Sequence, residues 1–194
     1  MVTAHAVLLI SEQAEKAGSV ITLLENQACR VQLHINQKDD VVDAVSSAQT
    51  DLVVVHTDSP SHFFLNQLYT ANQSNPKPII IFTNEREPSF IQSAIEAGVS
   101  SYVVDGLDEY RIGSIINVAC SRFKKEQALR SELSKTRSQL EERKVIEKAK
   151  GILMQRRKLS EDEAYKTLRK LAMDKNQRLV DVANNVLSVS ALLG

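Results

Sequence analysis

A histidine and an aspartate lie two residues apart at the end of an apolar run in "TDLVVVHTDSPSH", residues 50–62. Residues 51–56 are mostly β-branched and apolar, which is typical of a strand covered on both faces. His56 and Asp58 could together bind a metal ion, or His56 could accept a phosphoryl group. The other interpretation, which we favour, is that a single histidine at a strand tip is only a polar end of that strand.

The elements that must position His56 follow from four more runs of the same kind. Together the five runs cover residues 5–10, 30–35, 51–56, 78–83 and 101–104, and segments of helical length separate them. Strands that alternate with helices predict a doubly wound α/β domain with a five-stranded parallel sheet and right-handed crossovers. We expect this domain to occupy residues 1–120. In such folds function gathers at the carboxyl ends of the strands, where His56 lies.

Length and composition restrict the remaining possibilities. The chain of 194 residues can hold one full domain and a smaller module. No apolar run approaches the roughly 20 residues that span a bilayer, and the N-terminus lacks the features of a signal peptide. Cys29 and Cys120 lack metal-ligand spacing, so we expect reduced thiols in a cytoplasmic protein. The sequence contains no nucleophile–base pair, metal cluster or phosphate loop, so we predict neither an enzyme nor a bound cofactor.

Charge is divided unevenly along the chain. Residues 1–142 carry 12 Lys and Arg against 18 Asp and Glu, whereas residues 143–194 carry 12 against 6. A short basic segment behind an acidic body suggests that the segment contacts a polyanion. A solvated charged surface would explain the charge alone equally well.

A long helix should connect the two parts. From Asp108 to about Lys158 there is no proline, and the only glycines are Gly113 and Gly151. We predict a weak coiled coil over residues 108–142 that forms a homodimer, although Arg122 and Glu126 interrupt its seam. A single solvated helix is the alternative, but a helix this long and polar is rarely stable alone. The predicted seam consists of Ile112, Ile115, Ala119, Leu129, Leu133, Thr136 and Leu140.

The last 50 residues predict a module of three helices. The first continues the long helix through "VIEKAKGILMQRR". Ser160 and Glu163 form a capping box that opens the second helix, which should run to about Ala172. An apolar stripe that starts at Leu179 marks the third helix. We place this module at residues 143–194.

Residues 5–120 resemble the receiver domain of response regulators, whose sheet has the flavodoxin-like order. A threonine ends the fourth predicted strand, and Pro60 lies four residues beyond the tip of the third. In receivers an Asp at that tip accepts a phosphoryl group, an acidic pair holds Mg²⁺, and a hydroxyl and a Lys contact the phosphate. The resemblance assigns these positions to His56 for the acceptor, Ser11 and Glu12 for the acidic pair, Thr83 for the hydroxyl and Asp105 for the lysine.

These replacements remove the charges that phosphotransfer needs. An imidazole is a poor ligand for a hard cation, and Asp105 would repel a phosphoryl group. We therefore predict a degenerate receiver, or pseudo-receiver, without metal. It should act as a docking and dimerisation surface whose state is set by contact with another protein.

Residues 142–187 closely resemble the ANTAR domain, the RNA-binding module of transcription antiterminators. The matching positions are the run Ala149–Met154, Ala164, Leu168–Arg169, Ala172–Met173, Asn176, Leu179 and Asp181–Ala183. Within this family the stretches 58–61, 82–83 and 97–107 resemble most the nitrate-assimilation, NasT-like branch. Members of that branch keep an Asp at the position of His56, and the amidase-regulator branch, which also lacks the acceptor, is the alternative.

The resemblance and the positive charge together select candidate residues for contact with RNA. Gly151 in mid-helix costs about 1 kcal/mol relative to Ala, so it should permit close approach of a sugar-phosphate backbone or of another helix. Tyr165 is the segment's only aromatic residue, and we expect it in the core rather than under a base. The predicted RNA-binding residues are Arg143, Lys144, Lys148, Ala149, Lys150, Gly151, Met154, Arg157, Arg169 and Lys170.

The resemblance also implies a mechanism. Such proteins bind paired stem-loops in a leader transcript and stabilise them against an overlapping terminator, so that transcription continues. In the nitrate branch a ligand-sensing partner protein holds the regulator inactive until nitrate or nitrite releases it. Two other readings stay open, a DNA-binding response regulator and a module that binds only protein. The linker "MDKNQRL" lacks the short glycine turn of a helix-turn-helix, which disfavours the first.

Overall fold

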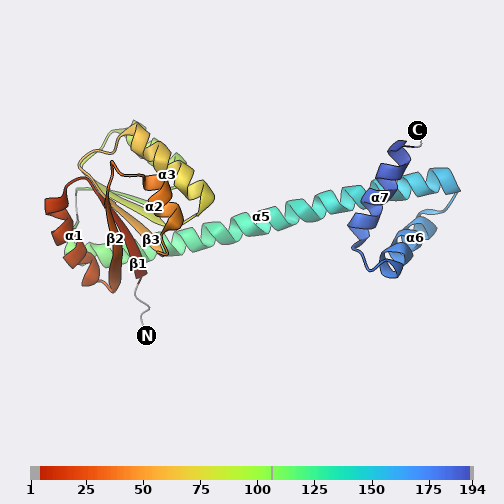
Figure 1. Ribbon diagram of the computed structural model, residues 1–194, viewed down its shortest axis with the longest axis horizontal. Helices are drawn as coiled ribbons and strands as arrows, with labels where there is room; N and C mark the ends of the chain where they lie inside the picture. The colour runs from red at the N-terminus through yellow and green to blue at the C-terminus, as the bar shows by residue number, and fades with distance from the viewer. Residues whose placement is uncertain (1–4, 106, 193–194) are drawn as a thin grey trace. The chain divides into compact units, whose positions relative to one another are not determined.

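Five parallel strands form the centre of the N-terminal part of the chain (Figure 1). They are β1 (His5–Ser11), β2 (Cys29–Asn36), β3 (Leu52–His56), β4 (Ile79–Thr83) and β5 (Ser101–Val104). Their order in the sheet is β2-β1-β3-β4-β5, which is the predicted doubly wound arrangement. The carboxyl ends of β1, β3 and β4 therefore lie next to one another, and this edge holds the first candidate site.

The structure is a computed structural model that describes residues 5–105 and 107–192. By its internal contacts the chain divides into two units, Met1–Gln127 and Ala128–Gly194. Helix α5 (Glu109–Arg157) contributes residues to both. None of the helices within the described ranges is long and apolar enough to cross a membrane.

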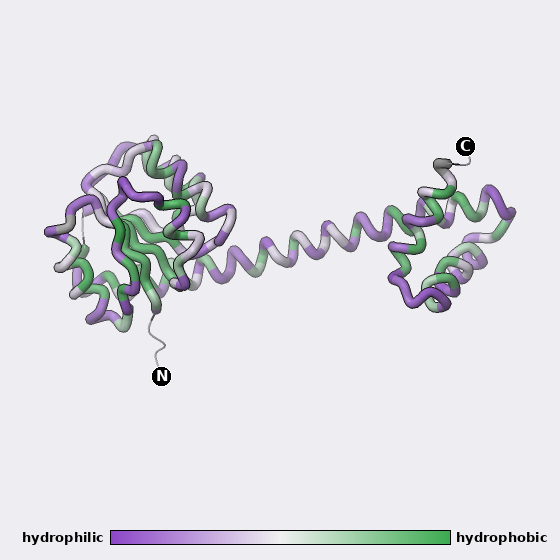
Figure 2. The backbone as a smooth tube through the Cα atoms, in the orientation of Figure 1, coloured by the Kyte–Doolittle hydropathy of each residue, from purple (hydrophilic) through white to green (hydrophobic). Residues whose placement is uncertain are grey.

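Alternate side chains of each strand enter two separate cores. Leu9 and Val54 face a core shared with α1 (Ala14–Glu25) and the start of α5. Leu8 and Val55 face a core shared with α2 (Val41–Ser47), α3 (His62–Ser74) and α4 (Pro88–Glu96). Because both of their faces are covered, β1, β3 and β4 are nearly unbroken apolar runs, which explains the sequence pattern. Figure 2 shows these hydrophobic strands together at the centre of the unit.

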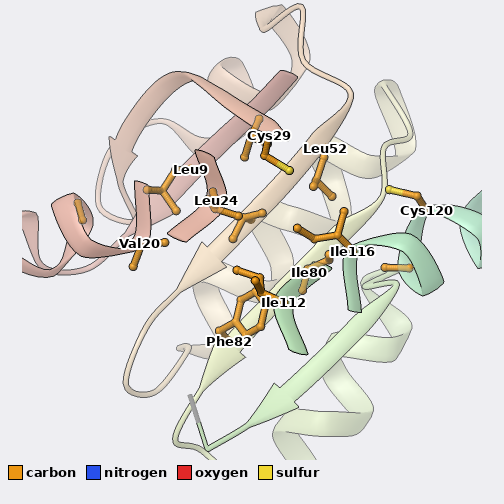
Figure 3. Packing of buried hydrophobic residues seen from close by; sticks show 14 residues of the cluster. Leu9, Val20, Leu24, Cys29, Leu52, Ile80, Phe82, Ile112, Ile116 and Cys120 are labelled. Atoms are coloured by element: carbon orange, nitrogen blue, oxygen red, sulfur yellow. The ribbon is translucent and has the colours of Figure 1, made fainter. Parts of the chain in front are cut away.

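The first turns of α5 belong to the core of the first unit. Ile112 and Ala119 are fully buried, and Ile115 is partly buried against this core. Figure 3 shows Ile112, Ile116 and Cys120 of α5 within the core. The prediction that these residues form part of a coiled-coil seam was therefore wrong. The spacing of a core-facing stripe and that of a coiled-coil seam are the same over two turns, so the sequence alone could not separate them.

The second unit is a small cluster of three helices. The end of α5, α6 (Glu161–Asp174) and α7 (Leu179–Leu192) surround a core that includes Ala149, Leu168 and Ala183. The predicted capping box is present, because the Ser160 side chain accepts from the backbone of Glu163 and the Glu163 carboxylate accepts from the backbone of Ser160. Helix α5 ends where Lys158 takes a left-handed conformation, with φ of 54°.

Candidate functional site

The predicted receiver-site residues all lie at the carboxyl edge of the sheet. Ser11 ends β1, His56 ends β3 and Thr83 ends β4, and strand pairing places Ser11 beside His56. Glu12 follows β1 directly, and Asp105 follows β5. The adjoining Gly106 lies outside the described residues. The structure thus brings together the positions that the sequence selected, and their chemistry depends on the partners of each side chain.

His56 is half-buried at this edge. Its pKa is lowered because burial disfavours the charged imidazolium and because the ammonium of Lys16 repels it, although Asp58 and Glu12 act in the opposite direction. The imidazole is therefore neutral near pH 7. A neutral imidazole between β1 and β4 fills the acceptor position without supplying the negative charge that a phosphoryl acceptor and its cation need.

Asp58 is surrounded by donors from three segments. Lys16 Nζ lies 3.3 Å from Asp58 Oδ2, Gln13 Nε2 donates over 3.3 Å, and Asn84 Nδ2 donates over 3.1 Å to Oδ1. Lys16 lies in the first turn of α1, at the edge where a receiver would hold its metal ion. The positive charge next to the Asp58 carboxylate is therefore the ammonium of Lys16, in the place where a receiver would have a bound metal ion.

Glu12 is likewise engaged by its neighbours. Thr57 Oγ1 donates to Glu12 Oε2 over 2.9 Å, and the backbone N–H of Asp58 lies 3.3 Å from the same oxygen. Thr57 is almost fully buried, so its hydroxyl depends on this acceptor. Within the described part of the chain, no group of three His, Cys, Asp or Glu side chains is arranged to hold a metal ion.

The remaining residues of this edge are also internally paired. Ser11 Oγ lies 2.8 Å from His34 Nε2, and Thr83 Oγ1 donates to the carbonyl of Asp58 over 3.0 Å. Asp105 forms an ion pair with Arg86, in the place where a receiver would present a lysine. The sequence indicated Glu12 and Asp58, but it gave no sign that Lys16, Thr57 and Asn84 would occupy their lone pairs.

The second candidate site lies on the end of α5. Lys144, Lys148, Gly151 and Gln155 occupy the face opposite the core of the second unit, at spacings of three and four residues. A Cβ atom added to Gly151 would meet no other atom within 4 Å. Packing inside this chain therefore does not explain the glycine, and its open side leaves room for a close approach from outside.

Two predicted RNA contacts are placed differently. Ala149 is fully buried in the three-helix core, so its side chain cannot reach a ligand. Lys150 is only 7% exposed, and its ammonium lies 2.9 Å from Glu147 and 2.8 Å from Glu161, which raises its pKa. The sequence showed Lys150 only as one lysine of a basic run. In the structure it lies at the edge of the three-helix core, where its ammonium pairs with Glu161 in the first turn of α6.

The cations of the basic segment fall into two groups. Lys144, Lys150, Lys166 and Arg178 form ion pairs with carboxylates. Among the described residues, eight others form no ion pair with a carboxylate, and we call them the free cations. They are Arg143, Lys148, Arg156, Arg157, Lys158, Arg169, Lys170 and Lys175.

Tyr165 differs from its expected place. It is 40% exposed and lines a shallow hollow with Lys150, Glu161 and Asp162. The prediction that it is a core residue was therefore wrong. Two of its neighbours in this hollow are carboxylates, which disfavour an RNA phosphate there.

Comparison with known proteins identifies similar proteins for both parts of the chain. Residues 134–187 match the ANTAR domain. "Transcriptional regulatory protein PdtaR" of Mycobacterium tuberculosis is 24% identical over 181 residues, which are 93% of this chain and 88% of that protein. A "Nitrate regulatory protein" of Klebsiella oxytoca is 50% identical over 66 residues, which are 34% of this chain but only 17% of that protein.

A solved structure supports the fold of the first unit. A CheY-like response regulator receiver domain protein from Methanospirillum hungatei superimposes with a TM-score of 0.55 at 14% identity, covering 64% of this chain and 99% of that one. At this identity the similarity concerns the fold. The predicted receiver-like sheet is confirmed.

Proposed function

The chain combines a receiver fold with a C-terminal ANTAR domain, and from this combination we propose that it is a transcription antitermination regulator. Its ANTAR helices bind stem-loops in a leader transcript, and a partner protein, not phosphorylation, controls this binding. A protein with this task works in the cytoplasm and needs no cofactor.

The free cations are the observation that carries RNA binding. Among the described residues of the segment that matches the ANTAR domain, eight Lys and Arg side chains have no carboxylate partner. Unpaired cations cost little to bring to a phosphate, because no internal ion pair has to be broken first. Their contacts with phosphates would release counterions and make the affinity steeply dependent on salt.

The edge of the sheet supports control by contact. The carboxylates of Glu12 and Asp58 are engaged by Thr57 and Lys16, so neither is free to hold Mg²⁺ or accept a phosphoryl group. We propose that the residues of the degenerate phosphoacceptor site stabilise the carboxyl edge of the sheet and carry out no phosphotransfer. These residues are Ser11, Glu12, His56, Thr83 and Asp105.

Helix α3 offers a surface suited to a protein partner. Residues 59–76 contain no Lys, Arg, Asp or Glu, although such residues make up 25% of the chain. On α3 and α4, Phe63 is 72% exposed, Tyr69 47% and Ile95 65%. Exposed aromatic residues without formal charge are typical of protein interfaces and unsuited to a polyanion. We assign this surface to the ligand-sensing partner.

The nitrate-assimilation branch is supported by one comparison. The Klebsiella oxytoca protein that is 50% identical over 66 residues is named a nitrate regulatory protein. We therefore propose nitrate or nitrite assimilation genes as the regulated class.

A gel-shift assay with purified protein tests the proposal. A leader RNA with two stem-loops and a DNA duplex of equal length are compared at about 150 mM salt, where surface charges are screened as in cells. We expect RNA to bind at least tenfold more tightly. Preference for the duplex would show a DNA-binding regulator, and absence of binding to either would favour a module that contacts only protein.

A further inference from the structure

A groove opens between the three helices of the second unit. Its cavity volume is about 320 Å³, and it lies between the end of α5, the end of α6 and one face of α7. Its floor is aliphatic, because Ile152, Leu171, Val186 and Val189 line it. Leu171 and Val189 are 36% and 54% exposed, so the part of the chain that the structure describes leaves the floor open to solvent.

The rim of this groove is positively charged. Arg156, Arg157 and Lys175 line it, and all three belong to the free cations. Arg156 is held in place by a 3.2 Å hydrogen bond from its guanidinium to the carbonyl of Ser190. The described residues that line the groove include no carboxylate. An apolar floor under three cations is complementary to a ligand with a flat uncharged body and an anionic edge.

We propose that this groove receives one unstacked nucleotide of an RNA loop. The base lies on the aliphatic floor, and the adjoining phosphates contact Arg156, Arg157 and Lys175. The Asn185 side-chain amide, which also lines the groove, can both donate to and accept from a base edge. This inference rests on the proposed RNA binding and adds the place and chemistry of loop recognition.

A nucleotide fits the groove better than a helix of a protein partner does. A docked helix needs an extended groove for anchors at several successive turns. The volume of about 320 Å³ is at the lower end for pockets that enclose a small ligand. The segment also lacks an aromatic platform at this place, since Tyr165 lines a different hollow. Recognition of an unstacked base then depends on aliphatic burial and edge hydrogen bonds.

Two neighbouring asparagines on α7 provide a matched test. Asn185 lines the groove, whereas Asn184 is exposed and does not line it. We expect Asn185→Glu to weaken binding to the leader hairpin at least tenfold, and Asn184→Glu to change it less than twofold. Equal losses would show only a general charge effect and would overturn the proposal. A change in sedimentation of Asn185→Glu, without the RNA effect, would identify the groove as an interface between copies and also overturn it.

An abasic scan identifies the nucleotide itself. Hairpins that lack one loop base at a time keep every phosphate, and we expect one such position to cost the full-length protein about tenfold in affinity. Val189→Phe fills the groove, so the same abasic position should then cost less than twofold. If the loss persists in Val189→Phe, the base lies elsewhere and the groove proposal fails while RNA binding stands. If the unmodified hairpin does not bind at all, the proposed function itself fails.

Discussion

At the scale of single residues, Lys16 changes what the sheet edge can do. Its ammonium lies 3.3 Å from Asp58, and both side chains are about half exposed. An exposed ion pair of this kind contributes little to stability. Its effect is on binding, because a divalent cation would have to displace Lys16 and two further donors, Gln13 and Asn84, before it reached Asp58. The negative charge of Asp58 is thus balanced by Lys16 and needs no metal ion.

This arrangement predicts that the protein does not take up phosphate. Incubation with acetyl phosphate and Mg²⁺ should leave its intact mass unchanged, because Glu12 and Asp58 are both engaged and the described residues of the edge form no cation site. Intact-mass spectrometry is the measurement, and a receiver that retains its Asp acceptor is the positive control. A phosphoryl adduct on Asp58 or Glu12 would contradict the pseudo-receiver.

His56 should make the first unit sensitive to acid. Since the folded state lowers the pKa of His56, unfolding favours proton uptake, and the stabilising contribution is lost as pH falls below the ordinary value of about 6.5. Thermal melts at about pH 7.5 and pH 5.5 should show a smaller drop in Tm for His56→Gln than for the natural protein. The effect should be modest because the imidazole is only half-buried. Parallel drops in the two proteins would show that other groups cause the acid sensitivity.

The sequence predicted which residues lie at the carboxyl edge of the sheet better than it predicted their hydrogen-bond and ion-pair partners. Strand ends and Pro60 were enough to place Ser11, His56 and Thr83 at one edge, because the carboxyl ends of neighbouring parallel strands must coincide. The engagement of Asp58 by Lys16 depends on side-chain directions from a helix and a loop, which no local pattern encodes. Lys150 failed as a predicted surface contact for the same reason, because its partner Glu161 comes from another helix.

At the scale of elements, helix ends and helix faces can be tested separately. Ser160 is the N-cap of helix α6: its hydroxyl accepts from the N–H of Glu163, and its own N–H donates to the Glu163 carboxylate. Ser160→Ala should lower the free energy of unfolding of the second unit by about 1 kcal/mol. Denaturant unfolding followed by circular dichroism measures this loss. Ser188→Ala, in the middle of α7, is the control and should be nearly neutral, and an equal effect of both changes would show that the cap is unimportant.

The exposed face of α6 contains both free and paired cations, which allows an internal comparison. Arg169 and Lys170 are free cations, whereas Lys166 forms an ion pair with Asp162. Arg169→Ala with Lys170→Ala should lower affinity for the leader RNA and reduce the salt slope by about 2, if each contacts one phosphate.

The comparison requires binding curves at several salt concentrations. Lys166→Ala should leave the slope within about 0.5 of the original, because that ammonium is already neutralised. The same reduction in Lys166→Ala would mean that pairing within the chain does not decide which cations meet RNA.

The number and order of elements were predictable, but the role of α5 was not. Alternating apolar runs indicated all five strands, and the capping box located α6. The start of α5 was assigned to a coiled coil because Ile112 and Ala119 follow its spacing, yet both are fully buried against the sheet. Only tertiary packing decides whether such a stripe meets its own domain or a second chain.

At the scale of the whole molecule, the two units have opposite charge. Residues 1–127 carry 9 Lys and Arg against 15 Asp and Glu, and residues 128–194 carry 15 against 9. The net charge of the first unit therefore disfavours contact with a polyanion, whereas that of the second favours it. This separation fits the proposed regulator, in which one unit contacts a protein and the other contacts a transcript. In a homodimer, the second copy would supply a second RNA-binding unit.

The exposed part of α5 provides a surface for such a homodimer. Leu129, Leu133 and Leu140 are 56%, 52% and 53% exposed, and with Thr136 they repeat at steps of four, three and four residues. Exposed leucines at this spacing on a polar helix are typical of a coiled-coil seam. We propose this stripe as the dimer seam, which would be shorter than the sequence suggested because it would begin after the residues that the sheet buries.

The double change Leu133→Lys with Leu140→Lys should abolish the dimer, because two positions that the second copy would bury would then carry charge. Sedimentation should show a monomer, and affinity for an RNA with two stem-loops should fall by about 10²-fold, since linked binding is lost. Affinity for a single stem-loop should stay unchanged, which separates loss of linkage from damage to the RNA-binding helices.

Ser131→Lys with Ser138→Lys is the matched control for this pair. These residues have the same spacing on α5 and lie on the side opposite the seam, so the double change should alter neither sedimentation nor binding to the two-loop RNA. A monomeric natural protein that still prefers two stem-loops over one would contradict the dimer, because linkage between two copies could then not be the source of the preference.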